Sequence, residues 1–473
     1  MSDHFVIIGN GAAGFRAAKA LRRASAAAQI SLFTRERYPF YLRRQLGDFL
    51  SGNLTLAELI FQSRNAYRRE RLDLFLMTPI AAADPAAHEV VFASGQRVQY
   101  DRLLIATGTE AVPLDLPGSA LEGVVCFDTL RSAVAARDAA DRARRVVLLD
   151  AGLVGLVLAQ SLAERGLEVT QLIAGERFWP EMLDEEASQR VERLLESNGV
   201  AVRRHADPAN IVGAAGRAIG VETRTGDRVA AELVLYGSRR RPAVGFLAGS
   251  GLDVGLGVRV DGRLRTSDPD VYAAGDVAET VPAPAGAPAP PETPFCWQRA
   301  WNHGAIAATN MLQVGPTAAL AAGAASCGGA LRLRAEIFGC ELAVLGQGHL
   351  SDGGQVETIR LRAAGGPEAY HRLVFRAGRL VGATVFGTGE YVAELERLIL
   401  AGAGRAEVER AIAPAAQALR LPQTFAQHCP ICAAELVVHH GTAAGTRIRC
   451  EACGTELVVR WDDQRLWLEL NLP

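Results

Sequence analysis

The sequence predicts an α/β protein with two parallel strand–turn–helix units, a small α+β domain and a cysteine-rich C-terminal module. Residues 4–33 run from a short apolar strand through a glycine-rich turn and a helical pattern to a second strand, and residues 145–173 repeat this order. Such units build parallel sheets. Residues 331–400 alternate strand-like stretches with glycine turns and end on a helical pattern, and two Cys-x-x-Cys pairs mark residues 429–473.

Length and composition limit the classes of protein to which the chain can belong. At 473 residues the chain is too long for one core, and its 49% of hydrophobic residues can build several. A net charge of −2 gives no reason to expect nucleic acid or a membrane surface as a partner. The apolar run 146–163 is interrupted by Asp150 and two glycines, so we expect no membrane span. Four of the eight cysteines stand outside the pairs without regular spacing, which indicates a reduced, cytoplasmic protein.

The order of these segments predicts the domain boundaries. The first α/β domain is expected to be split in sequence, with the second one inserted into it. The predicted segments are 1–110 (first domain, first part), 111–240 (inserted domain), 241–330 (first domain, second part), 331–405 (small α+β domain), 406–428 (linker) and 429–473 (cysteine module).

The first glycine-rich turn is typical of dinucleotide binding. The segment Gly9-Asn10-Gly11-Ala12-Ala13-Gly14 follows a strand and begins a helix, and Glu36 lies near the end of the next strand. Glycines permit a tight turn close to a pyrophosphate, the helix N-terminus supplies N–H donors, and the acid binds a ribose hydroxyl. The pattern predicts a Rossmann-like dinucleotide site.

Two further motifs identify the dinucleotide by resemblance. Residues 266–279, which include Gly275 and Asp276, resemble the second FAD motif of the pyridine nucleotide-disulfide oxidoreductase superfamily. The turn Ala106-Thr107-Gly108 resembles the one that separates the FAD domain from the inserted NAD-type domain in that family. The resemblance implies that FAD binds at the first site and that Asp276 holds the ribityl and pyrophosphate end of the cofactor.

Two more segments indicate the branch of the family. The stretch from Glu36 to Arg43 is similar to the one that lies over the flavin in NADH:rubredoxin reductases and in the N-terminal part of nitrite reductase large subunits. Residues 295–311 resemble the helix after the aspartate motif in that branch. The resemblance covers residues 4–400 and implies that Arg43 also contacts FAD. Because the chain lacks a pair of cysteines separated by four residues, as the branch does, disulfide reduction is not expected.

The second glycine-rich turn departs from the family pattern. Asp150 replaces the first glycine, Val157 replaces a helix acid, and Ile173 stands where an acid would hold the NADH ribose. Like charges ~4 Å apart cost roughly 1 to 4 kcal/mol, which corresponds to about tenfold to a thousandfold in affinity. We therefore expect NAD(P)H to bind poorly or not at all. The alternative is a divergent NADPH site, because the cluster Arg239–Arg241 would suit a 2′-phosphate.

The C-terminal cysteines predict a metal site. Cys429 and Cys432 form one pair, Cys450 and Cys453 form the other, and 17 residues separate the pairs. Four thiolates suit structural Zn2+ or a single iron. Rubredoxins resemble this module, but they carry Gly and an aromatic residue after the first pair, where this chain has Ala433. Zn2+ is therefore favoured over Fe, and so small a module needs its metal to fold.

These observations predict an FAD-dependent oxidoreductase that transfers electrons between its flavin and a protein redox partner. If the second site is impaired, the chain would act as a subunit of a larger redox complex. The alternative is a self-sufficient NAD(P)H-dependent reductase of a rubredoxin-like or ferredoxin-like acceptor. The partner is expected to dock through the cysteine module or through the cluster Arg239–Arg241.

Overall fold

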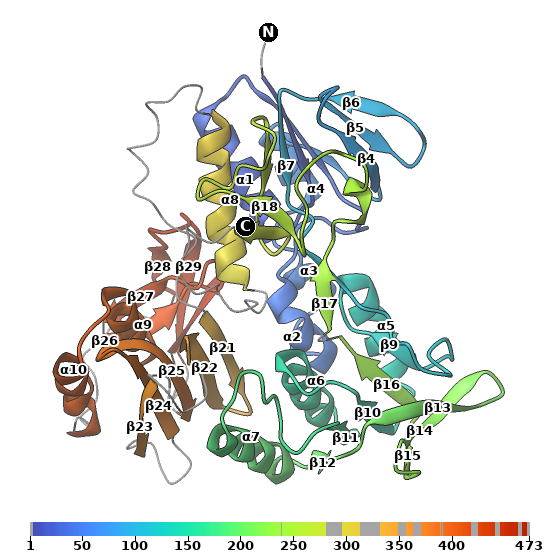
Figure 1. Ribbon diagram of the computed structural model, residues 1–473, viewed down its shortest axis with the longest axis vertical. Coiled ribbons are helices and arrows are strands. Elements are labelled where there is room, and N and C mark those ends of the chain that lie inside the picture. Colours follow the sequence, from blue (N-terminus) through green and yellow to red (C-terminus); the bar gives the residue numbers. More distant parts are fainter. Residues whose placement is uncertain are drawn as a thin grey trace. The chain divides into compact units, whose positions relative to one another are not determined.

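The computed structural model describes residues 3–237, 239–280, 296–312, 332–348, 356–362, 370–387, 389, 391–417, 424–439, 445–461 and 466–470. The chain forms two compact units, Met1–Gly329 and Ala330–Pro473 (Figure 1). None of the described helices is both long enough and apolar enough to cross a membrane.

The first α/β domain is built on a parallel sheet with the strand order β19-β7-β1-β2-β3. Side chains such as Val6, Ile7 and Leu104 are completely buried, as expected for parallel strands that are covered on both faces. The strands are β1 His4–Ile8, β2 Gln29–Phe33, β3 Asp73–Phe75, β7 Arg102–Ile105 and β19 Val271–Ala273.

Helices α1 Ala12–Ala24 and α8 Trp297–Leu312 pack side by side in this domain (Figure 1). A β-carbon on Gly304 of α8 would lie 2.2 Å from the carbonyl oxygen of Ala13, so only glycine permits this approach. The remaining elements of the domain are short. They are the antiparallel strands β4 Ile80–Asp84, β5 Glu89–Phe92 and β6 Arg97–Gln99, the paired strands β18 Val258–Val260 and β20 Ala278–Thr280, and the helices η1 Arg43–Gln45, α2 Leu46–Ser51, α3 Leu56–Leu59, α4 Arg64–Arg69 and η2 Gly245–Leu247.

The second α/β domain is inserted into the first, as predicted. The chain enters and leaves it through two antiparallel strands, β8 Thr109–Ala111 and β17 Arg240–Pro242. Its parallel sheet has the order β12-β11-β10-β16-β9. The elements are β9 Val124–Cys126, α5 Leu130–Ala140, β10 Arg145–Leu148, α6 Leu153–Glu164, β11 Glu168–Leu172, α7 Glu185–Ser197, β12 Ala201–Arg203 and β16 Leu233–Tyr236, with an antiparallel sheet of β13 Pro208–Ala214, β14 Arg217–Thr223 and β15 Arg228–Ala230.

Helix α2 of the first domain packs against the second domain. A β-carbon on Gly47 would lie 2.3 Å from Cγ1 of Val157 in α6, so the two helices meet at a glycine. Arg165, at the end of α6, donates a hydrogen bond of 3.1 Å to the carbonyl oxygen of Leu50. That carbonyl belongs to the last turn of α2, where carbonyls lack partners within the helix. The contact joins the two α/β domains.

The second compact unit contains the predicted small α+β domain. Its antiparallel sheet has the order β21-β22-β25-β24-β23, and α9 packs on it. The predicted linker begins too early, because residues of α10 as far as Ile412 pack on the core of this domain and Val408 is fully buried in it. The elements are β21 Arg332–Ile337, β22 Cys340–Gly346, β23 Val356–Arg362, β24 Tyr370–Arg376, β25 Arg379–Gly387, α9 Val392–Ala401 and α10 Arg405–Gln417.

The cysteine module is a pair of small antiparallel sheets. Strands β26 Thr424–His428 and β27 Glu435–His439 form one, so the module starts a few residues before the predicted boundary. The other contains β28 Arg447–Arg449, β29 Glu456–Trp461 and β30 Leu466–Leu470.

Candidate functional site

The turn after β1 requires glycine at two positions. Gly9 has a φ of +110°, and a β-carbon there would lie 2.1 Å from the carbonyl oxygen of Ala106. A β-carbon on Gly14 would lie 1.9 Å from the carbonyl oxygen of Gly9, so strand and helix meet in direct backbone contact. At Gly11, by contrast, a β-carbon would meet no described atom within 4 Å. The turn therefore opens at the N-terminus of α1, where N–H groups favour a bound phosphate.

Three sequence motifs meet at the carboxyl ends of neighbouring strands. The amide of Ala106, after β7, donates to the carbonyl oxygen of Ile8 in β1 at 2.8 Å. The amide of Ala274, after β19, donates to Ile105 in β7 at 2.9 Å. Thr107 and Gly108 continue from Ala106, and Gly275 and Asp276 continue from Ala274. The structure thus brings together the glycine turn, the Ala-Thr-Gly turn and the aspartate motif.

Asp276 is held by residues at the start of α8. Its Oδ1 accepts from the guanidinium of Arg299 and from the backbone amide of Cys296, both at 3.3 Å. Burial raises the pKa of Asp276, while Arg299 acts in the opposite direction. The preceding residue, Gly275, donates its amide to Nδ1 of His303 at 3.3 Å. Burial, together with the positive charge of Arg299, lowers the pKa of His303 to about 4.

Glu36 lies in a network of charged and polar side chains. Tyr41 donates its hydroxyl to one oxygen of Glu36 at 2.7 Å, and Arg43 donates to the other at 2.7 Å. Arg43 also donates to Oδ1 of Asp128 at 3.1 Å, and Arg240 forms an ion pair with the same atom. Since Asp128 belongs to the inserted domain, the predicted ribose acid is linked to both α/β domains.

The residues of the first site fit FAD. Two buried donors near the glycine turn and the aspartate motif, Nδ2 of Asn10 and Nε of Arg299, have no partner within the described part of the chain. Buried donors without partners are uncommon in folded proteins. A ligand with many acceptor oxygens, such as the phosphates and ribityl hydroxyls of FAD, would satisfy them. The glycine turn supplies the space for its pyrophosphate.

The second glycine-rich turn keeps the helix–strand contact of the first turn but lacks its first glycine and its acid. A β-carbon on Gly155 would lie 1.8 Å from the carbonyl oxygen of Asp150, so the helix–strand contact is preserved. Asp150 itself is only 4% exposed, and its φ is not positive, unlike that of Gly9. Ile173, at the predicted position of the ribose acid, is buried in the core. The turn thus presents an acid and an apolar side chain where the first site has glycine and Glu36.

Two of the three arginines in the cluster Arg239–Arg241 are engaged in ion pairs. Arg240 pairs with Asp128 and donates to Oγ1 of Thr109 at 2.8 Å. Arg241 pairs with Glu110 at 2.9 Å. These bonds brace the two strands that connect the α/β domains, so the charges of Arg240 and Arg241 are largely compensated. Arg239 is exposed.

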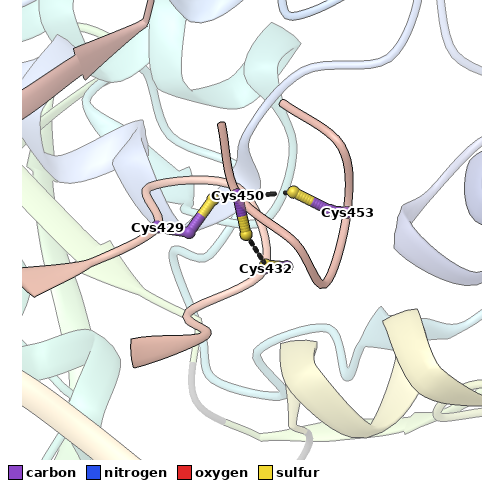
Figure 2. A group of neighbouring side chains, drawn as sticks. All are labelled: Cys429, Cys432, Cys450 and Cys453. Carbon is purple, nitrogen blue, oxygen red and sulfur yellow. Dashed lines mark hydrogen bonds between the residues drawn. The ribbon is translucent and has the colours of Figure 1, made fainter. Parts of the chain in front are cut away.

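The four C-terminal cysteines form the predicted cluster. Figure 2 shows their side chains turned toward one another. All four are buried, and the sulfur atoms lie within 4.8 Å of one another, with Cys429–Cys453 at 3.6 Å and Cys432–Cys450 at 3.5 Å. Tetrahedral Zn–S bonds of about 2.3 Å would separate the sulfurs by roughly 3.8 Å. The spacing therefore fits one tetrahedral metal ion.

Backbone amides support thiolates in this cluster. The N–H groups of Ile431 and Cys432 donate to Sγ of Cys429, and that of Thr455 donates to Sγ of Cys453. Thr455 also places its hydroxyl oxygen 3.0 Å from the sulfur of Cys453. Hydrogen bonds to the charged form favour a thiolate, which is the form that binds a metal. The donor set of four sulfurs suits Zn2+ and also a single iron.

The fold and the first site define a flavoprotein with two dinucleotide-type domains. The chain belongs to the pyridine nucleotide-disulphide oxidoreductase family, whose model matches residues 3–304. It is therefore an FAD-dependent oxidoreductase, which confirms the prediction from the sequence.

Several relatives of known function are similar over much of the chain. The anthranilate 1,2-dioxygenase system ferredoxin–NAD(+) reductase component of Burkholderia cepacia is 33% identical over 406 residues, which cover 85% of this chain and 95% of that protein. The rubredoxin-NAD(+) reductase of Pseudomonas putida is 30% identical over 274 residues, 58% of this chain and 71% of that protein. These names give no support to the prediction of an impaired NAD site.

Solved structures show the same fold. The ferredoxin reductase for the CYP199A2 system from Rhodopseudomonas palustris has a TM-score of 0.71 at 24% identity, and covers 81% of this chain and 91% of that chain. The covalent putidaredoxin reductase–putidaredoxin complex has a TM-score of 0.72 at 22% identity, and covers 88% of this chain and 99% of that chain.

Three residues of the first site, Tyr41, Asp128 and Arg299, could not be predicted individually from the sequence. Tyr41 and Arg299 lie in segments that were matched only as whole stretches, and Asp128 lies outside every motif. Asp128 meets Arg43 across 85 residues of sequence, so no local pattern could have indicated this contact.

Proposed function

We propose that the protein transfers electrons between FAD in the first α/β domain and a protein redox partner. The observation that carries this proposal is the meeting of the glycine turn, the Ala-Thr-Gly turn and the aspartate motif at the ends of neighbouring strands, beside two buried donors that have no partner in the described part of the chain. The similarity to proteins named as ferredoxin and rubredoxin reductases supports a small redox protein as the partner. The sequence has no pair of cysteines separated by four residues, which argues against disulfide reduction.

The residues of the first site would act by binding and orienting the cofactor. Bound FAD supplies the electron-accepting ring system. The N-terminus of α1 and the turn at Gly11 would hold the pyrophosphate, and Glu36 would accept hydrogen bonds from the ribose. Asp276, anchored by Arg299 and the amide of Cys296, would hold the ribityl end.

For the second domain, we propose weak binding of NAD(H). A carboxylate at Asp150 would repel a pyrophosphate, and Ile173 offers the ribose no acceptor. On this basis the chain receives or delivers its electrons mainly through protein partners, as a subunit of a larger redox complex.

A second candidate function is a self-sufficient NAD(P)H-dependent reductase. The names of the two relatives described above favour it, because both include NAD(+). In that case the nucleotide would bind despite Asp150, with the pyrophosphate displaced from the turn. Arg239 would then be available for a 2′-phosphate, whereas Arg240 and Arg241 already have acidic partners.

The cysteine module is proposed to hold structural Zn2+ rather than iron. We favour the cysteine module over the cluster Arg239–Arg241 as the docking site of the redox partner, since two arginines of that cluster already form ion pairs. A structural metal would fix the shape of the docking surface without taking part in electron transfer.

Electron transfer to a protein acceptor tests the proposed function. The yellow protein would be reduced anaerobically with dithionite, freed of excess reductant, and mixed with oxidised rubredoxin or [2Fe–2S] ferredoxin in a stopped-flow instrument. Rapid reoxidation of the flavin, with matching reduction of the acceptor, is expected for at least one of the two. If both acceptors react no faster than a small dye of similar potential, specific transfer to such proteins is refuted.

A further inference from the structure

Glu36, the predicted ribose acid, is oriented by two side chains that both reach the second α/β domain. Tyr41 donates to Oε2 of Glu36 and accepts from the backbone amide of Leu130 at 3.1 Å. Arg43 donates to Oε1 of Glu36 and also to Asp128. Asp128 and Leu130 flank the N-cap of α5, so both paths end at the same turn of the inserted domain.

Asp128 is well placed to fix the side chain of Arg43. An arginine side chain loses rotamer entropy when it is held in one conformation. Arg43 is 42% exposed, so Glu36 alone would leave it considerable freedom, whereas Asp128 is only 13% exposed and receives both Arg43 and Arg240. Arg43 donates to the backbone carbonyl of Asp128 as well as to its carboxylate. The guanidinium is thus held from two sides.

We propose that Asp128, supplied by the inserted domain, is a positioning residue of the flavin site: it orients Arg43, and Arg43 orients Glu36 toward the ribose of FAD. This inference rests on the proposed binding of FAD to the first domain. It adds that a residue of the second domain contributes to flavin binding, so that the second domain has a role even where it binds no nicotinamide nucleotide.

Hydrogen exchange at the backbone amide of Leu130 provides a probe of the same connection between the two α/β domains. This amide stands at the first position of α5, where an amide has no acceptor within the helix, and its acceptor here is the hydroxyl of Tyr41. If FAD fixes Glu36 and thereby Tyr41, flavin binding should slow hydrogen exchange at Leu130. An amide in the middle of α5 should respond much less.

The test compares D128N with E110Q in the full-length holoprotein. D128N removes the charge that Arg43 and Arg240 share. E110Q removes a charge that pairs with Arg241 at 2.9 Å and with Arg35 at 3.3 Å. Glu110 lies in one of the connecting strands and has no described ion pair with Arg43. FAD release on dilution, followed by flavin fluorescence, gives the dissociation constant of each protein.

We expect D128N to raise the dissociation constant for FAD about tenfold or more, E110Q to leave it nearly unchanged, and D128E to recover most of the loss. The melting temperature of each apo-protein separates loss of positioning from loss of folding. Y41F provides the second measurement, because it should abolish the FAD-dependent protection of Leu130 without removing a charge.

Equal FAD affinity in D128N and the unmodified protein would overturn the inference, as would FAD-dependent protection of Leu130 that persists in Y41F. Both results presuppose an unmodified protein that binds FAD. If that protein binds no FAD, the proposed function itself fails, and the two failures are therefore distinguishable.

Discussion

The carbonyl oxygen of Asp150 lies 1.8 Å from the position that a β-carbon on Gly155 would occupy. Gly9 and Gly14 have the same relationship in the first domain, at 1.9 Å. The second turn therefore preserves the contact that packs its helix on its strand, while an acid replaces the glycine that would face a pyrophosphate. This turn therefore keeps the glycine that the fold requires and lacks the glycine that binding of a pyrophosphate requires.

Removing the acid from the second turn should strengthen binding of NADH. We expect D150G to lower the dissociation constant for NADH about tenfold or more, because repulsion of the pyrophosphate is removed. Isothermal titration calorimetry of the oxidised protein with NAD+ and of the dithionite-reduced protein with NADH measures this. D150N is the matched variant that keeps the size of the side chain and loses its charge. Unchanged affinity in both variants would show that Asp150 does not limit binding.

Adding a methyl group at Gly14 should abolish the flavin site. G14A places a β-carbon against the carbonyl oxygen of Gly9, and such overpacking costs about 1–3 kcal/mol even where the structure adjusts. We expect the protein to be purified with little FAD and to melt at a lower temperature. G262A is the control, since a β-carbon there meets no described atom within 4 Å. The ratio of flavin to protein absorbance checks the prediction, and a full complement of FAD in G14A would contradict it.

Acid should destabilise the first compact unit through His303. Its pKa is lowered from 6.5 to about 4 in the folded protein, so the unfolded chain binds a proton that the folded chain excludes between these pH values. Stability is therefore retained above pH 6.5 and falls as the pH drops toward 4, by up to about 3 kcal/mol. Melting temperatures from pH 7 to pH 5 should fall less steeply in H303Q than in the unmodified protein. Parallel pH profiles would exclude His303 as a source of the acid sensitivity.

Removing the metal should unfold the cysteine module and spare the flavin. We expect about one Zn2+ per chain by elemental analysis, and loss of ordered structure in residues 424–439 and 445–461 when it is removed with a chelator or by C432S. Hydrogen exchange of this segment and the visible flavin spectrum measure the two effects separately. C340S, outside the cluster, serves as the control. An iron-based visible spectrum, or a module that stays protected without metal, would contradict the assignment.

Local signals in the sequence account for much of the fold and of the first site. The turn from Gly9 to Gly14 could be predicted because strand, glycines and helix are contiguous, and the structure confirms the two Rossmann-like domains and the cluster of four cysteines. The roles assigned to Glu36, Arg43 and Asp276 in binding FAD stay predictions.

Contacts between distant segments could not be predicted in this way. Asp128 reaches Arg43, and Leu130 reaches Tyr41, only because the inserted domain folds back on the first. The pairing of Arg240 with Asp128 likewise joins two segments that are distant in the sequence. The helical pattern after residue 405 gave no sign that Val408 would belong to the core of the small domain, because burial depends on the partner surface and not on the helix alone.

Anaerobic titration of the flavin with NADH distinguishes electron transfer through protein partners from direct reduction by a nicotinamide nucleotide. The oxidised holoprotein would be titrated with NADH and then with NADPH while the visible flavin absorbance is followed, and dithionite would be added at the end. We predict that micromolar nucleotide leaves the flavin oxidised and that dithionite then bleaches it, because protein partners carry the electrons. Rapid and complete bleaching by micromolar NADH or NADPH would contradict it, and would establish the chain as a self-sufficient nicotinamide-dependent reductase.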